Sequence, residues 1–246
     1  DVYKRQKVWY QPVFNLKTNR FSSAEALLRL RDYDGEPVSP SEFIPLAEET
    51  GLIDDLSWIV LEEVCMLLGQ MRDKIDSISI NLSMQQFEDR SLCARIHECL
   101  NRSGLNPDQL KIEVTERVLL QDMDYMKMMM EEMTGEGFGF YLDDFGTGYS
   151  NISCALSLPF EYIKLDRSLL VRLPGDSKVQ VFVRSMVETF HAMGQKIVAE
   201  GVEEEEQIEL LRQFGVDCVQ GYYYGKPMPE DEFRAAVAKG WEEQRR

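Results

Sequence analysis

Residues 8–31, VWYQPVFNLKTNRFSSAEALLRLR, contain two strand-like runs joined by a very short connection. The runs lie near 8–16 and 22–31, and little more than residues 17–20 separates them. A parallel crossover needs a dozen or more residues, so the two strands are expected to pair antiparallel as a hairpin.

The rest of the chain alternates short strand-like runs with helical patterns. Six further strands are expected near 77–83, 110–116, 138–143, 161–166, 196–200 and 217–223. Helices are expected from about Ser39-Pro40 and over 56–71, 83–100, 118–134, 176–193, 203–214 and 229–243, with left-handed glycines just after four of them at Gly104, Gly135, Gly194 and Gly215. This alternation implies a parallel sheet with right-handed crossovers, and eight strands favour a closed barrel. The predicted fold class is therefore α/β, a modified (β/α)₈ TIM-type barrel with the first strand antiparallel.

Length and charge limit the domain organisation and the partners. The chain has 246 residues, of which 44% are hydrophobic and 28% charged, enough for one large core. Residues 1–7 fit no expected element, so a single domain is assigned to 8–246, and the start at Asp1 suggests a fragment of a longer protein. The net charge of -16 disfavours binding to a nucleic acid polymer.

Cysteine and histidine usage indicates a reduced, cytoplasmic setting. The five cysteines include no Cys-x-x-Cys pair, so a disulfide framework is not expected. His97 and His191 are far apart, and neither is judged to have a Cys or His partner at ligand spacing, so both are interpreted as ordinary helix residues. No apolar run approaches the roughly 18 residues of a membrane span, so no membrane contact is expected for this segment.

Polar and charged side chains collect at the carboxyl ends of the expected strands, where barrels place their functional residues. Asn81 and Glu113 are out of phase with their apolar neighbours, so they are expected to point into the barrel mouth. Contact with solvent explains any one such residue but not the whole set, which is Glu25, Asn81, Glu113, Glu116, Asp143, Asp144, Lys164, Asp166, Glu200 and Gln220.

So many carboxylates facing one another would repel, and divalent cations resolve that conflict. A ligand set of carboxylate and amide oxygens favours Mg²⁺ or Mn²⁺. Two ions bridged by Asp143, with Asp144 on the second, are suited to activating a water and holding a phosphoryl oxygen. Lys164 is expected to add a fixed positive charge, and Glu200 to accept a proton from that water.

The assembled residues resemble the EAL-domain family of cyclic di-GMP phosphodiesterases over about residues 10–237. The resemblance rests on an ordered series of short motifs: Tyr10-Gln11-Pro12, Glu25-Ala26-Leu27-Leu28-Arg29, Asn81-Leu82-Ser83, Glu113-Val114-Thr115-Glu116, the Asp143–Ser150 turn, Lys164-Leu165-Asp166, Ala199-Glu200-Gly201 and Gln220-Gly221-Tyr222.

The resemblance implies an irregular barrel with a reversed first strand, and hydrolysis of cyclic di-GMP to linear pGpG with two Mg²⁺ or Mn²⁺ ions. Carried over by position, the metal ligands are Glu25, Asn81, Glu113, Asp143 and Asp144, and the catalytic set is Glu200, Lys164 and Gln220. The substrate-binding set is Gln11, Leu27 and Arg29, and Glu116 stabilises the loop after Asp144. The family also implies a homodimer and, in a longer chain, a sensory or diguanylate cyclase (GGDEF) domain, with a membrane anchor outside these residues as an option.

Two alternatives remain beside the phosphodiesterase. One is a catalytically silent receptor that binds cyclic di-GMP, whose expected signature is a missing ligand among Glu25, Asn81, Glu113 or Asp143; this chain keeps all four. The other is a barrel metallohydrolase for a different phosphodiester. Competition among cyclic dinucleotides distinguishes the two hydrolases.

Overall fold

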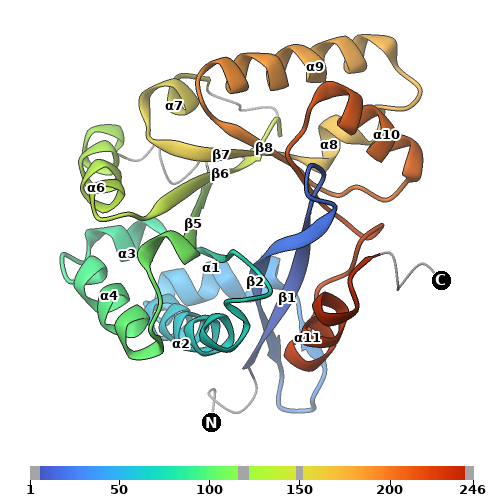
Figure 1. The fold of residues 1–246 in the computed structure, drawn as a ribbon. Coiled ribbons are helices and arrows are strands. Elements are labelled where there is room, and N and C mark those ends of the chain that lie inside the picture. The colour runs from blue at the N-terminus through green and yellow to red at the C-terminus, as the bar shows by residue number, and fades with distance from the viewer. Residues whose placement is uncertain (1–5, 116–121, 148–151, 242–246) are drawn as a thin grey trace.

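The computed structural model describes residues 6–115, 122–147 and 152–241, and its core is a closed barrel of strands ringed by helices (Figure 1). Around the ring the strands follow the order β1-β9-β8-β7-β6-β5-β4-β2, and β2 pairs with β1 to close it. The bounds are β1 (Gln6–Asn15), β2 (Arg20–Arg31), β4 (Ser77–Asn81), β5 (Leu110–Thr115), β6 (Gly139–Phe145), β7 (Phe160–Leu165), β8 (Lys196–Ala199) and β9 (Cys218–Gln220).

The reversed first strand is confirmed. β1 pairs antiparallel with both β2 and β9, whereas every pair from β2–β4 round to β8–β9 is parallel. The connection is tight because the Asn15 side-chain carbonyl accepts the N–H groups of Lys17 and Thr18, and Asn19 adopts a left-handed φ of 52°. β1 begins at Gln6, so two of the seven residues left unassigned by sequence belong to the barrel.

Two very short strands extend the ring and were not expected from sequence. β3 (Pro37–Val38) pairs with the end of β2, and β10 (Met228–Pro229) pairs with β1. Each contributes only two residues, too few to show a period-2 pattern.

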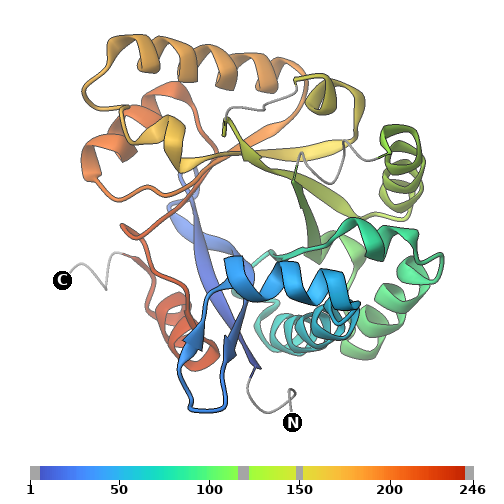
Figure 2. The same cartoon turned by 180° about the vertical axis from the view of Figure 1, so that it is seen from behind.

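Helices surround the strands on the outside, as seen from both sides (Figures 1 and 2). Their bounds are α1 (Pro40–Thr50), α2 (Ile53–Met71), α3 (Met84–Glu88), α4 (Leu92–Ser103), α6 (Met123–Gly135), α7 (Ile152–Ser157), α8 (Arg167–Leu170), α9 (Ser177–Ala192), α10 (Glu205–Phe214) and α11 (Glu230–Lys239), with a 3₁₀ turn over Pro107–Gln109. Within the described ranges, no helix is both long and apolar enough to cross a membrane.

The single helix expected over 83–100 is wrong. The chain leaves the helix at Asp89, where φ is -76° and ψ 104°, and α4 begins afresh at Leu92. The Asp89 carboxylate accepts hydrogen bonds from the N–H and hydroxyl of Ser91, and this local bonding competes with a continuous helix.

Other helix details differ by a turn or less. Gly104, Gly194 and Gly215 have positive φ as expected, but Gly135 lies inside the last turn of α6 and Gly137 takes the left-handed conformation instead. α6 begins at Met123 because the Asp122 carboxylate accepts the N–H of Tyr125. Residues 118–121 and 242–243 of the expected helices lie outside the described residues.

Candidate active site

The carboxyl ends of the parallel strands bring together the residues that the sequence placed there. Glu25 lies in β2, Asn81 ends β4 and Glu113 lies in β5, with Asn81 and Glu113 paired in register. Further round the ring are four more site residues: Asp143 and Asp144 in β6, Lys164 in β7, and Gln220, which ends β9. Glu200 follows β8 directly, and its N–H donates to the Leu165 carbonyl of β7.

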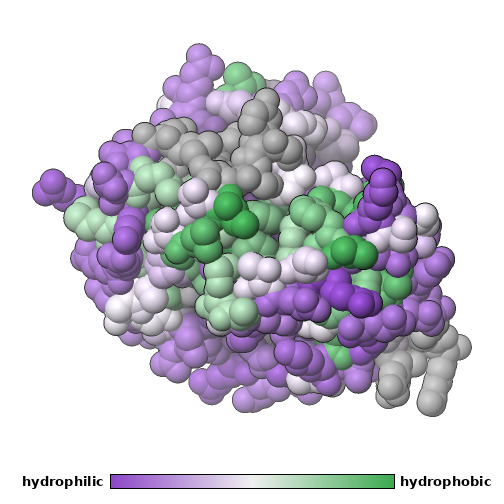
Figure 3. All heavy atoms as spheres, turned by 90° about the horizontal axis from the view of Figure 1, so that it is seen from above, coloured by the Kyte–Doolittle hydropathy of each residue, from purple (hydrophilic) through white to green (hydrophobic). Residues whose placement is uncertain are grey.

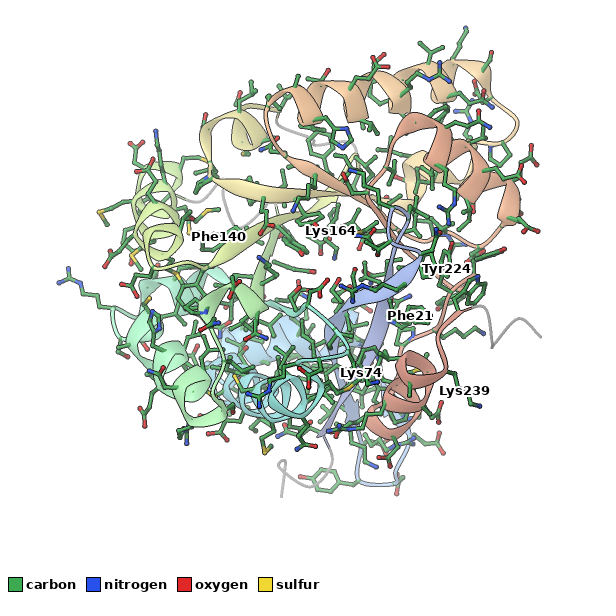
Figure 4. All side chains as sticks on the ribbon, in the orientation of Figure 1. Phe21, Lys74, Phe140, Lys164, Tyr224 and Lys239 are labelled. Carbon is green, nitrogen blue, oxygen red and sulfur yellow. The ribbon has the colours of Figure 1, made fainter. Side chains whose placement is uncertain are left out.

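Lys164 is the centre of this group. Its side chain points into the ring of strands (Figure 4) and is 2% exposed. Its Nζ lies within 4 Å of four carboxylates: 2.6 Å from Glu113, 2.8 Å from Glu200, 2.9 Å from Asp143 and 3.4 Å from Glu25. One ammonium is therefore shared by four acids.

Burial and mutual repulsion perturb the pKa values of these acids. Burial, and then the negative charge of Glu25, raises the pKa of Glu113 well above its usual value, although Lys164 opposes the shift. Burial raises the pKa of Glu200 to about 8, again against Lys164 and with help from Asp143. Burial alone would lower the pKa of Lys164, but the surrounding carboxylates raise it well above its usual value. The site is therefore short of positive charge.

Amide side chains fix the position of Glu25. The Asn81 amide donates to one Glu25 oxygen at 3.1 Å, and the Gln220 amide donates to the other at 2.6 Å. Gln220 also donates to Gln11 at 3.1 Å, and Gln11 donates to the Gly225 carbonyl. This chain of hydrogen bonds joins β1, β2, β4 and β9 at the barrel mouth.

An unusual backbone conformation directs the two adjacent aspartates of β6 to the same region. Asp144 has a left-handed φ of 58°, and the pairing with β7 shifts register between Leu142 and Phe145. Oxygens of Asp143, Asp144 and Glu200 lie within 4.8 Å of one another. The sequence expected the turn immediately after the strand, whereas the strand continues to Phe145 through this irregularity.

These donors fit a hard divalent cation. All of them offer carboxylate or amide oxygens, the set that Mg²⁺ and Mn²⁺ prefer. The Oδ1 atom of Asp143 is buried and makes no aligned hydrogen bond, because its 2.9 Å contact with Lys164 has only the geometry of an ion pair. An oxygen held in that state is a natural ligand for a cation.

Two adjoining cavities open over the carboxylates and share Leu27, Asp143 and Asp144. Arg29 lines the first, on the α1 side, and Gln11 lines the second with Lys164 and Glu200. The Arg29 guanidinium donates to the Leu28 carbonyl at 2.9 Å and lies 5.9 Å from the centre of the Trp9 ring. The structure thus places all three residues assigned to substrate binding beside the acids, whereas Glu116 lies outside the described residues.

The second cavity also contains Arg167 and Tyr222, which were not among the predicted site residues. Tyr222 ends the motif Gln220-Gly221-Tyr222, and Arg167 directly follows the motif Lys164-Leu165-Asp166. Arg167 forms a 3.1 Å ion pair with Glu203 and brings a positive charge to the rim. Their positions just after β7 and β9 were the available signal.

A second group of side chains of the types that bind metals lies elsewhere and includes His97. Cys93 stands four residues before His97 on α4, which is a ligand spacing on a helix, and both contact Glu136. The judgement that His97 has no Cys partner at ligand spacing was therefore wrong. His191 instead contacts Asp217.

Comparison with known proteins agrees with the geometry. A profile of the family described as "EAL domain" matches residues 3–227. The bifunctional diguanylate cyclase/cyclic di-GMP phosphodiesterase MucR of Pseudomonas aeruginosa is 37% identical over 235 residues, covering 93% of this chain and 34% of MucR. The signaling protein YkoW of Bacillus subtilis is 35% identical over 230 residues, covering 93% of this chain and 29% of YkoW. The chain thus spans about a third or less of these relatives' length.

Solved structures are similar over nearly their full length. The structure titled PaMucR phosphodiesterase, c-di-GMP complex, is 34% identical with a TM-score of 0.85, and the match covers 94% of this chain and 95% of that one. The EAL domain protein of Listeria monocytogenes EGD-e is 30% identical with a TM-score of 0.85, covering 96% of this chain and 94% of that one.

Proposed function

Because the chain belongs to the EAL domain family, we propose that it is a metal-dependent phosphodiesterase that hydrolyses cyclic di-GMP to linear pGpG. The observation that carries the proposal is the sharing of Lys164 by four buried or half-buried carboxylates at the mouth of the barrel. A purely structural group of acids would be neutralised by the protein itself, whereas this one leaves negative charge for a cation.

Five oxygen-donor residues would hold the ions. They are Glu25, Asn81, Glu113, Asp143 and Asp144, which lie on β2, β4, β5 and β6. A bound Mg²⁺ or Mn²⁺ supplies a Lewis acid for the phosphoryl oxygen and lowers the pKa of a bound water. The Asn81 and Gln220 amides hold both oxygens of Glu25 and so keep this ligand in one orientation.

Two side chains perform the remaining steps. Glu200 accepts a proton from the attacking water as the water oxygen bonds to phosphorus. The bond from phosphorus to the leaving ribose oxygen breaks, that oxygen takes up a proton from solvent, and Glu200 returns its own proton to solvent. Lys164 keeps Glu200 close to Asp143, since its ammonium lies 2.8 Å from one and 2.9 Å from the other. Its fixed positive charge also offsets the negative charge that develops on the phosphoryl group in the transition state.

Substrate binding is assigned to the two cavities. Arg29 offers a guanidinium to a phosphate of the dinucleotide, and the apolar Leu27 lies between the two cavities. Gln11 is buried between Gln220 and Gly225, which sets its amide at the floor of the second cavity. These contacts supply local attraction for an anion on a chain whose net charge is -16.

The direct test is turnover by the purified chain. We expect conversion of cyclic di-GMP to pGpG, followed by chromatography, in Mg²⁺ or Mn²⁺ and its loss on adding a chelator. Glu25→Ala should abolish turnover, whereas Glu209→Ala, which removes an exposed carboxylate from α10, should leave the rate unchanged. Binding of cyclic di-GMP without turnover in any metal would assign the silent receptor instead. Faster turnover of a different cyclic dinucleotide would assign that compound, rather than cyclic di-GMP, as the substrate.

We also propose that the domain forms a homodimer and works within a longer cytoplasmic protein that carries sensory or GGDEF regions. The MucR relative is named for both cyclase and phosphodiesterase activities and is about three times as long as the match. Hydrophobic side chains gather on the face seen from the α9 side (Figure 3). Exposed apolar residues of α7 and α9 include Ile152, Leu156, Val181 and Phe182. Sedimentation of the chain and of Phe182→Glu, which should dissociate the dimer, tests this part.

A further inference from the structure

Three side chains with different ligand atoms meet on the outer side of the barrel. Cys93 and His97 lie one turn apart on α4, and Glu136 follows the last turn of α6. The Cys93 Sγ lies 3.2 Å from Glu136 Oε2, and His97 Nε2 contacts the same oxygen. All three residues are at the surface or half-buried, outside the ring that encloses Lys164.

The geometry is close to that of a bound transition metal. One ligand atom from each residue lies within 4.8 Å of the other two. In a tetrahedral zinc site, bonds of about 2.0–2.3 Å place neighbouring ligand atoms about 3.3–3.8 Å apart. Side-chain adjustments alone bring the cluster to that spacing, since the helices already hold the three residues together.

We propose that Cys93, His97 and Glu136 form a second metal site, of the zinc class, with water in the fourth position. A thiolate, an imidazole and a carboxylate together select Zn²⁺ over Mg²⁺, because sulfur and nitrogen are soft or borderline ligands. The ion joins α4 to the segment that leads directly into β6, the strand carrying Asp143 and Asp144. It is chemically distinct from the oxygen-only group around Lys164.

The local charges favour a cation and account for the protons. Burial, and then the Glu136 carboxylate, raises the pKa of the Cys93 thiol to about 12, and Glu132 adds to the shift. Hydrogen bonds from Cys93 and His97 lower the pKa of Glu136, so it is already ionised. Metal binding breaks the S–H bond of Cys93 and releases that proton to solvent. The Nε2–H proton of His97 that faces Glu136 also leaves to solvent, Nδ1 takes up a proton in its place, and the imidazole binds the metal through Nε2.

Cobalt is the probe that separates this site from the active site. Co²⁺ added to the untagged, reduced chain should give one near-ultraviolet thiolate-to-cobalt band per chain, removed by Zn²⁺. The ligand set around Lys164 contains no sulfur, so this band reports a cysteine alone. Cys65, Cys99, Cys154 and Cys218 are buried, which leaves Cys93 as the accessible thiol of the chain.

Variants decide the assignment. Cys93→Ser should abolish the band. His97→Gln should weaken Zn²⁺ binding by at least about 100-fold, because losing a residue that only hydrogen-bonds to a metal ligand already lowers metal affinity about 10–100-fold. Glu98→Gln, an exposed neighbour on α4, and Glu25→Ala in the candidate active site should both keep the band. A folded wild-type chain without the band would overturn the proposal, as would a band that survives Cys93→Ser. Loss of cyclic di-GMP turnover has no bearing on this readout, so the two assignments fail separately.

Discussion

Charged side chains meet at both ends of the barrel strands, but their balance differs. At the carboxyl ends, Lys164 is shared by four carboxylates. At the amino ends, Glu161 has two lysines, with Lys111 Nζ at 2.6 Å and Lys196 Nζ at 3.3 Å. One end has an excess of negative charge and the other an excess of positive charge.

The pKa values follow this balance. Burial would raise the pKa of Glu161, but the hydrogen bonds and charges of Lys111 and Lys196 lower it below its usual value. For Glu113, burial and the neighbouring acids outweigh Lys164 and the pKa rises. Lys111 and Glu113 stand two residues apart on β5, so the local charge changes from an excess of positive to an excess of negative over one repeat of the pleat. Burial acts to raise the pKa of both carboxylates; the difference in local neutralisation distinguishes the end that carries the candidate active site.

The largest expected effect is that of Lys164→Met. Removing the buried ammonium leaves four carboxylates facing one another, so the metal-free protein should lose about 3–5 kcal/mol of unfolding free energy. Turnover should fall about 10³-fold, as when a preorganised charge is removed from a transition state. Urea unfolding in chelator and in Mg²⁺ measures the first effect, and Mg²⁺ should restore part of the stability.

The matched control for this change is Lys196→Met at the amino end. The Lys196 side chain is half exposed and Glu161 keeps Lys111 as a partner, so the loss should stay below about 1 kcal/mol. Equal losses of unfolding free energy in the two variants would contradict the view that positive charge is scarce only at the carboxyl ends of the strands.

Strand-end chemistry was predictable from the sequence because it follows from two local regularities. The position of Glu25, Asn81 or Glu113 at a strand's carboxyl end depends on the strand's limits and phase, both visible in the apolar pattern. The short hairpin connection likewise predicted the reversed β1. The sequence could not show which acids a positive charge neutralises. That Lys164 reaches four carboxylates depends on distances between strands that only the folded structure gives.

Features that join distant segments were missed for the same reason. Cys93 and Glu136 are 43 residues apart and meet only because α4 and α6 pack on the same side of the barrel.

Two local features were also missed. The helix break at Asp89 was missed because hydrogen bonding by the Asp89 side chain overrides an apolar pattern that continues through it. Similarly, nothing in the sequence pattern distinguished the left-handed Asp144 from an ordinary strand residue.

Glu200→Gln should have the second largest effect. Glutamine keeps the shape but cannot accept the water proton, so kcat should fall about 10²-fold or more while KM for cyclic di-GMP changes little. Steady-state kinetics in saturating Mn²⁺ measures both constants. Glu206→Gln, an exposed residue of α10 with the same charge change, should match the wild type. An unchanged kcat for Glu200→Gln would remove this residue from proton transfer.

Glu161→Gln should affect stability without affecting catalysis. It removes the carboxylate that pairs with the nearly buried Lys111 and should cost about 1–3 kcal/mol of unfolding free energy. Because this pair lies at the amino ends of the strands, kcat and KM should stay within twofold of the wild type. A large loss of turnover in a protein of normal stability would break the division between the two ends.

The smallest effect is a pH dependence whose sign differs between the two ends. Burial would raise the pKa of Asp217, just before β9, but hydrogen bonds from Lys17, the Ile197 N–H and His191 lower it. A lowered pKa means that Asp217 stabilises the fold above its unfolded value of about 4 and loses this contribution as pH falls through the folded value. The wild type should therefore exceed Asp217→Asn by about 1 kcal/mol at pH 7, and the gap should close in acid.

Glu200, with its pKa raised to about 8, should behave in the opposite way in the metal-free protein. Its protonated form is compatible with the fold below the unfolded pKa of about 4.3, and stability is lost as pH rises from there through 8. Glu200→Gln should therefore gain on the wild type as pH rises from about 4 to 8, whereas Asp217→Asn should fall behind it as pH rises from strongly acid values to about 4. Urea unfolding of the three proteins in chelator across both ranges measures both slopes. Slopes of the same sign would show that the two ends of the barrel neutralise their acids alike.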